Sequence, residues 1–135
     1  MLNVPSVLCC AAVLHKEDNT VLLVQRPLHK SMGGMWEFPG GKVEEFERPQ
    51  ETIIRELFEE LGVVVSLENI EPFTFVSHTY DHFHLNMFVF LCKHWVGEVV
   101  LKEGQPQYAW VLPENLKDYL VPSADEPIIK RLMNS

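Results

Sequence analysis

The residues best suited to chemistry are three glutamates, Glu56, Glu59 and Glu60, in the segment RELFEELG at positions 55–62. In a helix, positions i, i+3 and i+4 share one face, so the three carboxylates would lie together and repel one another at neutral pH. A solvated acidic surface is the ordinary explanation for such a cluster. The alternative is a site for a hard cation such as Mg²⁺, which takes oxygen ligands from a few carboxylates and from substrate phosphates.

Two neighbouring features favour the cation site. The Gly40-Gly41 pair ahead of the helix can offer a backbone carbonyl to the same ion. Arg55 can brace Glu47 through a bidentate ion pair, which would fix the carboxylates next to it.

The element that must present these glutamates is a helix over residues 49–61. Pro49 suits the first helical turn, and Gly62 stands where a left-handed C-cap belongs. The spacing i, i+3, i+4, i+7 predicts a core-facing stripe of apolar residues on this helix. Its members are Ile54, Leu57, Phe58 and Leu61.

The rest of the chain reads as strands with helices interspersed. Residues 7–14 and 21–25 predict two strands that form a hairpin through the turn at 16–19. A short strand at 36–38 precedes the chain reversal at Pro39-Gly40-Gly41. Further strands are expected at 73–78, 84–92 and 107–111, and further helices at 113–119 and 126–133. This mixture predicts an α/β fold in one domain spanning residues 1–135.

Composition and charge limit the partners of the chain. Of its 135 residues, 47% are hydrophobic and 22% are charged, which is ordinary for a globular protein and excludes a disordered or collagen-like chain. The net charge of −8 disfavours nucleic acid polymers and anionic membranes, so a polyanionic ligand needs cations to bind. No targeting or membrane-spanning segment is evident, so we expect a cytoplasmic protein, present as a monomer or a weak homodimer.

The segment around the glutamates resembles the Nudix box, G-x5-E-x7-R-E-U-x-E-E-x-G-U, in which U is apolar. Every specified position is filled, by Gly41, Glu47, Arg55, Glu56, Leu57, Glu59, Glu60, Gly62 and Val63. The approach to the box at 36–42, the segment at 95–106 and the tail at 122–127 are also similar to the MutT branch of this family. The resemblance implies an α/β/α sandwich around a mixed β-sheet.

The resemblance further implies Mg²⁺-dependent hydrolysis, with Mn²⁺ as a substitute, of a nucleoside triphosphate to a monophosphate and pyrophosphate. In the MutT branch, the substrate is an oxidised guanine nucleotide, 8-oxo-dGTP, and its removal protects DNA from mutation. The implied metal ligands are the Gly40 carbonyl, Glu56, Glu59, Glu60 and Glu103. Glu56 is the first candidate for activating the attacking water and Glu103 the second, while Glu47 and Arg55 support them.

The base and phosphate contacts implied by the resemblance involve Arg26, Glu37, Phe83, His84 and Asp125. Asp125 stands where MutT proper has Asn, and this difference opens two alternatives. A protonated Asp125 can donate a hydrogen bond to 8-oxoguanine as Asn does, whereas an ionised Asp125 only accepts and would suit the amino group of cytosine. The alternative within the family is therefore a CTP or modified-dCTP pyrophosphohydrolase. A catalytically silent, nucleotide-sensing domain is a third possibility, which the intact set of glutamates disfavours.

Two further departures concern the approach to the helix. The family often carries Gly-Glu-Ser/Thr where this chain has Phe46-Glu47-Arg48. Loss of the hydroxyl N-cap at position 48 predicts a cost of about 0.5–2 kcal/mol in helix stability. Phe46 either avoids a positive φ or adopts it under strain.

Overall fold

Two β-sheets make up the centre of the computed structural model, which describes residues 3–134. The larger sheet has the order β4-β1-β6-β5. It contains β1 (Ser6–Leu14), β4 (Gly40–Lys42), β5 (Ile70–Thr79) and β6 (His84–Cys92). β1 runs parallel to β6 and antiparallel to β4, so the sheet is mixed. The smaller sheet is antiparallel and joins β3 (Trp36–Glu37), β2 (Val21–Gln25) and β7 (Tyr108–Val111).

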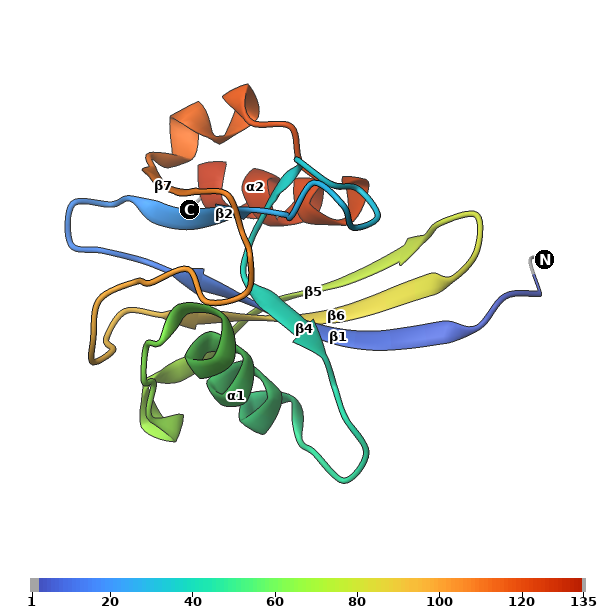
Figure 1. The fold of residues 1–135 in the computed structure, drawn as a ribbon, viewed down its shortest axis with the longest axis horizontal. Helices are drawn as coiled ribbons and strands as arrows, with labels where there is room; N and C mark the ends of the chain where they lie inside the picture. The colour runs from blue at the N-terminus through green and yellow to red at the C-terminus, as the bar shows by residue number, and fades with distance from the viewer. Residues whose placement is uncertain (1–2, 135) are drawn as a thin grey trace.

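Two α-helices cover opposite faces of the mixed sheet (Figure 1). They are α1 (Pro49–Leu61) and α2 (Glu126–Met133), and three short 3₁₀ helices lie between elements: η1 (Leu67–Asn69), η2 (Pro113–Asp118) and η3 (Ser123–Asp125). This arrangement confirms the expected α/β/α sandwich around a mixed sheet. None of the helices within residues 3–134 is both long and apolar enough to cross a bilayer.

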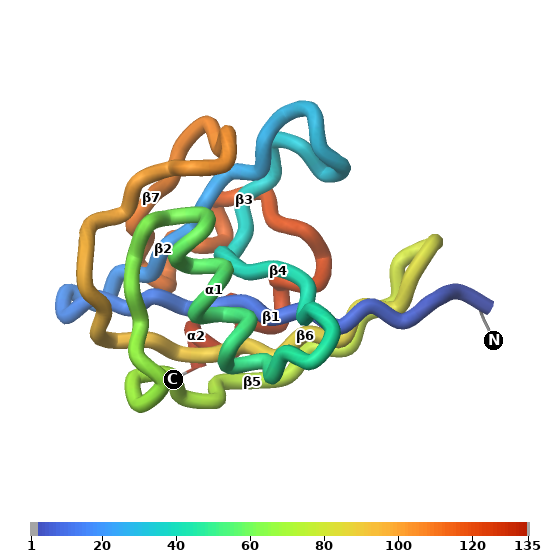
Figure 2. Tube along the Cα trace, turned by 60° about the horizontal axis from the view of Figure 1, so that its bottom comes forward, coloured from blue at the N-terminus to red at the C-terminus, as the bar shows by residue number. Residues whose placement is uncertain are grey.

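β1 divides the interior between the two helical layers, because successive side chains of a strand point to opposite faces. Ala11 and Val13 belong to the core under α2. Cys10, Ala12 and Leu14 belong to the core under α1. Figure 2 shows β1 running through the molecule, with its start beside the turn that joins β5 to β6. The central strand therefore couples the helix that carries the glutamates to the layer that carries the C-terminal helix.

The predicted hairpin of residues 7–14 and 21–25 is wrong. Within the described residues, the one β-bridge between these two segments joins His15 and Val21, and β1 and β2 belong to different sheets. Both edges of β1 are already occupied, by β6 along its full length and by β4 at Cys9–Ala11. β2 therefore pairs with β3 and β7 instead.

The predicted helices hold with two corrections. α1 begins and ends where predicted, and Gly62 has the left-handed φ of 71° expected of its C-cap. However, the buried stripe is Ile53, Leu57 and Leu61, while Ile54 is only partly buried and Phe58 is 52% exposed. The helix is rotated so that Glu56 lies against Gly41 of β4, whereas Glu59 stays exposed. The helix predicted at 113–119 is the 3₁₀ helix η2, which begins at Pro113 and ends at Asp118.

Candidate active site

Arg55 is the structural centre of the acidic helix face. Its Nε and Nη2 donate to the two carboxylate oxygens of Glu47, at 2.7 and 3.0 Å, so the bidentate pair expected between them is present. Its Nη1 donates to Glu56 at 2.7 Å and to Glu59 at 3.2 Å, and Nη2 also reaches the carbonyl of Lys42 at 3.2 Å. All five guanidinium N–H groups are thus engaged, which fixes the rotamers of the carboxylates around it.

Glu47 is the main partner of Arg55 in this set of hydrogen bonds, which we call the brace. It accepts hydrogen bonds from Arg55, from the backbone N–H of Glu44 and from the Thr52 hydroxyl. These donors lower the pKa of Glu47 to about 2, so it stays ionised at physiological pH. Glu47 therefore ties the loop before α1 to the helix itself.

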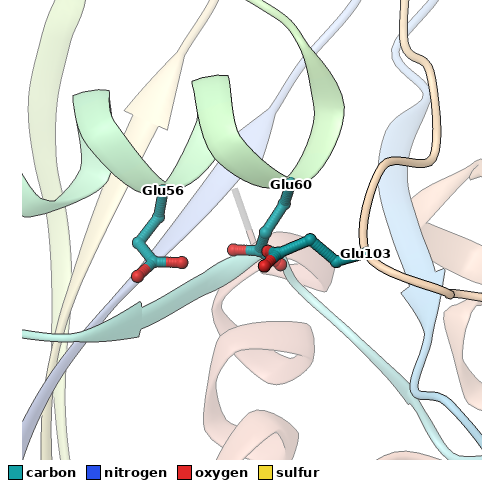
Figure 3. Close-up of side chains that lie close together, drawn as sticks. All are labelled: Glu56, Glu60 and Glu103. Atoms are coloured by element: carbon teal, nitrogen blue, oxygen red, sulfur yellow. The ribbon is translucent and has the colours of Figure 1, made fainter.

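Three carboxylates converge beside α1: Glu56, Glu60 and Glu103 offer ligand atoms that all lie within 4.8 Å of one another. Figure 3 shows Glu56 and Glu60 pointing from one side of α1, with Glu103 reaching toward Glu60 from the connection between β6 and β7. Glu59, the other predicted ligand, lies outside this group and contacts Arg55. The cluster thus contains three of the four carboxylates expected to hold metal.

Glu103 reaches the cluster because its loop satisfies the end of α1. The last carbonyls of a helix lack partners within the helix. Here the backbone N–H of Val100 donates to Leu61 O at 2.9 Å, and that of Lys102 donates to Glu60 O at 3.0 Å. The Gln105 side chain donates to the same Glu60 carbonyl and accepts from Glu103 N–H. A pairing of backbone groups therefore delivers a carboxylate that lies over 40 residues away in the sequence.

Glu60 shows that the cluster suits a cation. Its Oε2 is buried and has no hydrogen-bond partner within the described residues. Burial, together with the neighbouring carboxylates Glu56, Glu37 and Glu103, raises its pKa well above the ordinary value. A buried carboxylate without a donor is costly, and a divalent ion would satisfy Oε2 and neutralise the repulsion. The donor set, which is all oxygen, fits a hard cation.

Gly41 lets β4 approach these carboxylates. A Cβ added at this residue would lie 2.5 Å from the carboxyl carbon of Glu56, so no side chain fits there without displacing the glutamate. Gly40 and Gly41 also line a neighbouring pocket. The predicted contribution of the Gly40 carbonyl stays a prediction.

That pocket has a volume of about 450 Å³ and lies between the carboxylates and the C-terminal layer. Of the predicted substrate residues, it is lined by Arg26, Glu37, Phe83 and Asp125. Its other lining residues include Cys9, Met32, Lys42, Tyr80 and Met87, which sequence reasoning missed. These residues come from segments far apart in the chain, so no local pattern could have grouped them.

His84 does not line this pocket, although Phe83 does. Its Nδ1 lies 2.8 Å from the Thr79 hydroxyl, in an exposed pair across the β5–β6 hairpin. Neighbouring residues at a strand end point in different directions, so only one of the two can face the pocket. The predicted role of His84 at the base therefore has no support in this geometry.

Arg26 and Glu37 form an ion pair on the pocket wall. Arg26 Nη1 lies 3.2 Å from both carboxylate oxygens of Glu37, and its Nε donates to the carbonyl of Ser31 at 2.9 Å. Burial raises the pKa of Glu37, and the charge of Arg26 opposes this shift. The guanidinium retains N–H groups that can meet a phosphate, while its orientation is set by Glu37.

Asp125 is the most deeply buried acid of the pocket, with 6% of its surface exposed. Its Oδ2 accepts a hydrogen bond from the Phe38 backbone N–H at 3.2 Å, whereas Oδ1 has no partner within residues 3–134. Burial, and then the nearby charge of Glu37, raises the pKa of Asp125 to about 7. The side chain thus titrates near neutral pH and presents one uncommitted oxygen.

Comparison with known proteins shows the family to which this chain belongs. A family model described as the NUDIX domain matches residues 10–131. The chain belongs to the Nudix family. It is accordingly a hydrolase of phosphoric anhydride bonds, and Nudix hydrolases generally need a divalent metal.

The most informative Nudix relatives are bacterial. The 8-oxo-dGTP diphosphatase of Proteus vulgaris is 36% identical over 104 residues, which cover 77% of this chain and 91% of the relative. The Escherichia coli K12 enzyme of the same name is 31% identical, covering 89% and 91%. A CTP pyrophosphohydrolase of Escherichia coli K12 is 32% identical, covering 90% and 88%.

Solved Nudix structures share the fold. A MutT structure from work on the Aliivibrio salmonicida and Vibrio cholerae proteins has a TM-score of 0.81 and 32% identity, covering 96% of this chain and 98% of its own. MutT from Methanosarcina mazei Go1 has a TM-score of 0.85 and 25% identity, covering 99% and 97%.

The two departures from the usual Nudix box are resolved in different ways. Phe46 keeps the left-handed conformation, with φ of 66°, and its side chain is 98% exposed, so this position is strained. At Arg48 no hydroxyl caps the helix, but Glu51 accepts from the Arg48 backbone N–H at 2.8 Å. One half of a capping box therefore offsets part of the expected loss.

Proposed function

We propose that this Nudix hydrolase converts 8-oxo-dGTP to 8-oxo-dGMP and pyrophosphate with Mg²⁺ as its cofactor, Mn²⁺ being able to substitute. One observation carries the choice of base: Asp125 is buried in the pocket beside the carboxylate cluster, with one oxygen uncommitted. The relatives named 8-oxo-dGTP diphosphatase support the same substrate.

The metal would be held by Glu56, Glu60 and Glu103, with the Gly40 carbonyl as a further ligand. When bound, Mg²⁺ neutralises phosphate charge and lowers the pKa of an attacking water. Glu59, which contacts Arg55 and lies outside the cluster, would be a further ligand. The net charge of −8 explains why the triphosphate needs these cations to approach.

The general base in this proposal is Glu56, with Glu103 as the alternative. Arg55 donates to Oε1 of Glu56 at 2.7 Å, which fixes the orientation of that carboxylate. Arg55 is held in turn by Glu47. Arg26 would meet the phosphates, since it lines the pocket with N–H groups still available.

Base recognition rests on the protonation of Asp125. With a pKa of about 7, a large fraction of Asp125 is protonated at neutral pH and can donate from Oδ1, as an amide does. Phe83 forms an aromatic wall of the same pocket, on which a base can stack.

A CTP or modified-dCTP pyrophosphohydrolase is the second candidate. The same titration leaves a substantial ionised fraction of Asp125, which accepts hydrogen bonds and suits an exocyclic amino group. The relative named CTP pyrophosphohydrolase supports this candidate. In either case we propose a cytoplasmic enzyme, a monomer or weak homodimer, that acts on free nucleotides.

Pyrophosphate release from a panel of nucleotides tests the proposal. With Mg²⁺, kcat/KM for 8-oxo-dGTP should exceed that for dGTP and CTP by about tenfold or more, a margin of about 1.4 kcal/mol. A preference for CTP or a modified dCTP would promote the second candidate. No turnover of any nucleotide with Mg²⁺ or Mn²⁺ would instead favour a silent, sensing domain.

The position of attack is tested with isotopically labelled water. We expect attack at the β-phosphorus, so that hydrolysis in ¹⁸O-water labels pyrophosphate. Label in the monophosphate would contradict this assignment. Excess chelator should abolish turnover, and added Mg²⁺ should restore it.

A further inference from the structure

The turn that carries Asp125 is tied to the β5–β6 hairpin by one side chain. The backbone N–H of Ala124 donates to the hydroxyl of Tyr80 at 3.0 Å, across 44 residues of sequence. Ala124 is buried and immediately precedes Asp125 in η3. Tyr80 therefore holds the residue next to the buried acid.

A second bond holds the same turn to a different element. Oδ2 of Asp125 accepts from the Phe38 backbone N–H, which lies just after β3. Two consecutive residues of η3 are thus attached to two different segments, Ala124 to Tyr80 and Asp125 to Phe38. With both bonds in place, the direction of the uncommitted Oδ1 is fixed relative to the pocket.

Tyr80 is itself rigidly placed. Its ring contacts those of His78, at a centroid distance of 4.5 Å, and Phe83, at 5.1 Å. Its backbone N–H donates to the Phe83 carbonyl at 2.8 Å and so closes the hairpin turn. Tyr80 and Phe83 both line the pocket. The hydroxyl is consequently an acceptor held at a defined point, not a mobile surface group.

We infer that Tyr80 is a positioning residue for base selection, which acts by fixing the place of the Asp125 carboxyl group in the pocket. The inference rests on the proposed function only in taking this pocket as the site of the base. It assigns Tyr80 no part in the hydrolytic step, because the carboxylate cluster is built on α1 and the β6–β7 connection. A substitution at Tyr80 should therefore change KM and the preference between nucleotides while leaving kcat nearly unchanged.

Tyr80→Phe tests this role, because it keeps the ring and removes only the acceptor. We expect KM for the preferred nucleotide to rise about three- to tenfold, the effect of one lost hydrogen bond, with kcat within twofold of the wild type. The ratio of kcat/KM between the two best nucleotides should fall by a similar factor. Tyr119→Phe is the matched control, since Tyr119 packs on Trp36 and does not line the pocket. All kinetics are measured well below the melting temperature of each variant.

A double-mutant cycle shows whether Tyr80 acts through Asp125. In an Asp125→Ala background, Tyr80→Phe should change KM by less than twofold, because the group that it positions is gone. Equal effects in both backgrounds would overturn the inference. So would an unchanged KM and nucleotide ratio in Tyr80→Phe, or a loss confined to kcat. Because the ratio uses the two best nucleotides of the wild type, a wrong choice of 8-oxo-dGTP appears in the wild-type panel and leaves this test intact.

Discussion

The site has two ends, the acidic end around Arg55 on α1 and the base end at Asp125 in the neighbouring pocket, and they differ in how fully their polar groups are hydrogen-bonded. At the acidic end, all five N–H groups of Arg55 are engaged, and Glu47 accepts from three separate groups. At the base end, the Asp125 carboxylate makes one hydrogen bond and keeps one oxygen uncommitted within the part of the chain that the structure describes. The first end is held rigid before substrate arrives, whereas the second leaves bonding capacity for the substrate. The chemistry is therefore fixed by the fold, while the choice of base depends on a few side chains.

This contrast predicts its largest effect at Glu56. Glu56→Gln should lower kcat by about 10²-fold or more on every nucleotide tested, since it removes a charge and the first candidate for the general base. The ratio between nucleotides should stay the same. Glu68→Gln, at an exposed glutamate in η1, is the control and should leave kcat unchanged. A nearly normal kcat for Glu56→Gln would indicate that the cluster is a solvated acidic surface and not a catalytic site.

Weakening the brace around Arg55 should have an intermediate effect on kcat. Arg55→Lys keeps the charge but cannot form the bidentate pair with Glu47 while also reaching Glu56. We expect kcat to fall about tenfold or more, again on all nucleotides, together with a lower melting temperature. Arg48→Lys alters an exposed ion pair with Glu51 and should change neither quantity measurably. If the fall in kcat of Arg55→Lys differed between nucleotides, catalysis and base selection would not be independent, and the proposed contrast between the two ends would be wrong.

A smaller, base-dependent effect is expected at Asp125. Because its pKa is raised to about 7, the protonated donor form is lost as pH rises through that value. The wild-type kcat/KM for 8-oxo-dGTP should therefore fall up to about tenfold between pH 6 and pH 8. Asp125→Asn, a donor at every pH, should flatten that decline, and its profile serves as the reference for titration of the nucleotide itself. A wild-type profile that rises through pH 7, with Asp125→Asn losing about ten- to hundredfold on CTP, would support an ionised acceptor instead.

The smallest effect is expected where the loop before α1 is strained. Phe46 has a φ of 66° and a fully exposed side chain, so Phe46→Gly should relieve strain without removing a contact. The greater freedom of Gly in the unfolded chain offsets part of this gain, so we expect a stabilisation below about 1 kcal/mol and unchanged kinetics. Phe46→Ala retains the strain and should show no gain. Denaturant unfolding of the three proteins provides the measurement.

The same contrast explains what the sequence could reveal. α1, its glycine C-cap and the pair of Arg55 with Glu47 lie within about 15 residues of one another, so helical spacing and the box motif predicted them. The burial of Asp125 and its bond to Phe38, 87 residues away, depend on tertiary packing that no local pattern records. The error at the β1–β2 hairpin has the same origin, because strand neighbours in sequence compete with distant strands for one edge.

The apolar stripe of α1 illustrates a subtler limit. Ile53 and Ile54 are both apolar, so periodicity alone permits two stripes that differ by one rotation step. In the structure, Ile53 belongs to one core cluster with Cys10 and Ala12 of β1. In this rotation, Glu56 lies beside Gly41 of β4 and Glu60 lies beside Glu103. The hydrophobic pattern of the helix alone therefore does not specify which of the two stripes is buried.

The close approach of Gly41 to Glu56 has an evolutionary consequence. A single methyl group at this position would push the carboxylate aside while leaving every acidic residue in the sequence, and Asp125 at the other side of the pocket, unchanged. Descendants of such a gene could keep nucleotide affinity yet lose turnover in one mutational step. When related chains are sorted into hydrolases and non-hydrolytic nucleotide receptors, this glycine should be inspected together with the glutamates.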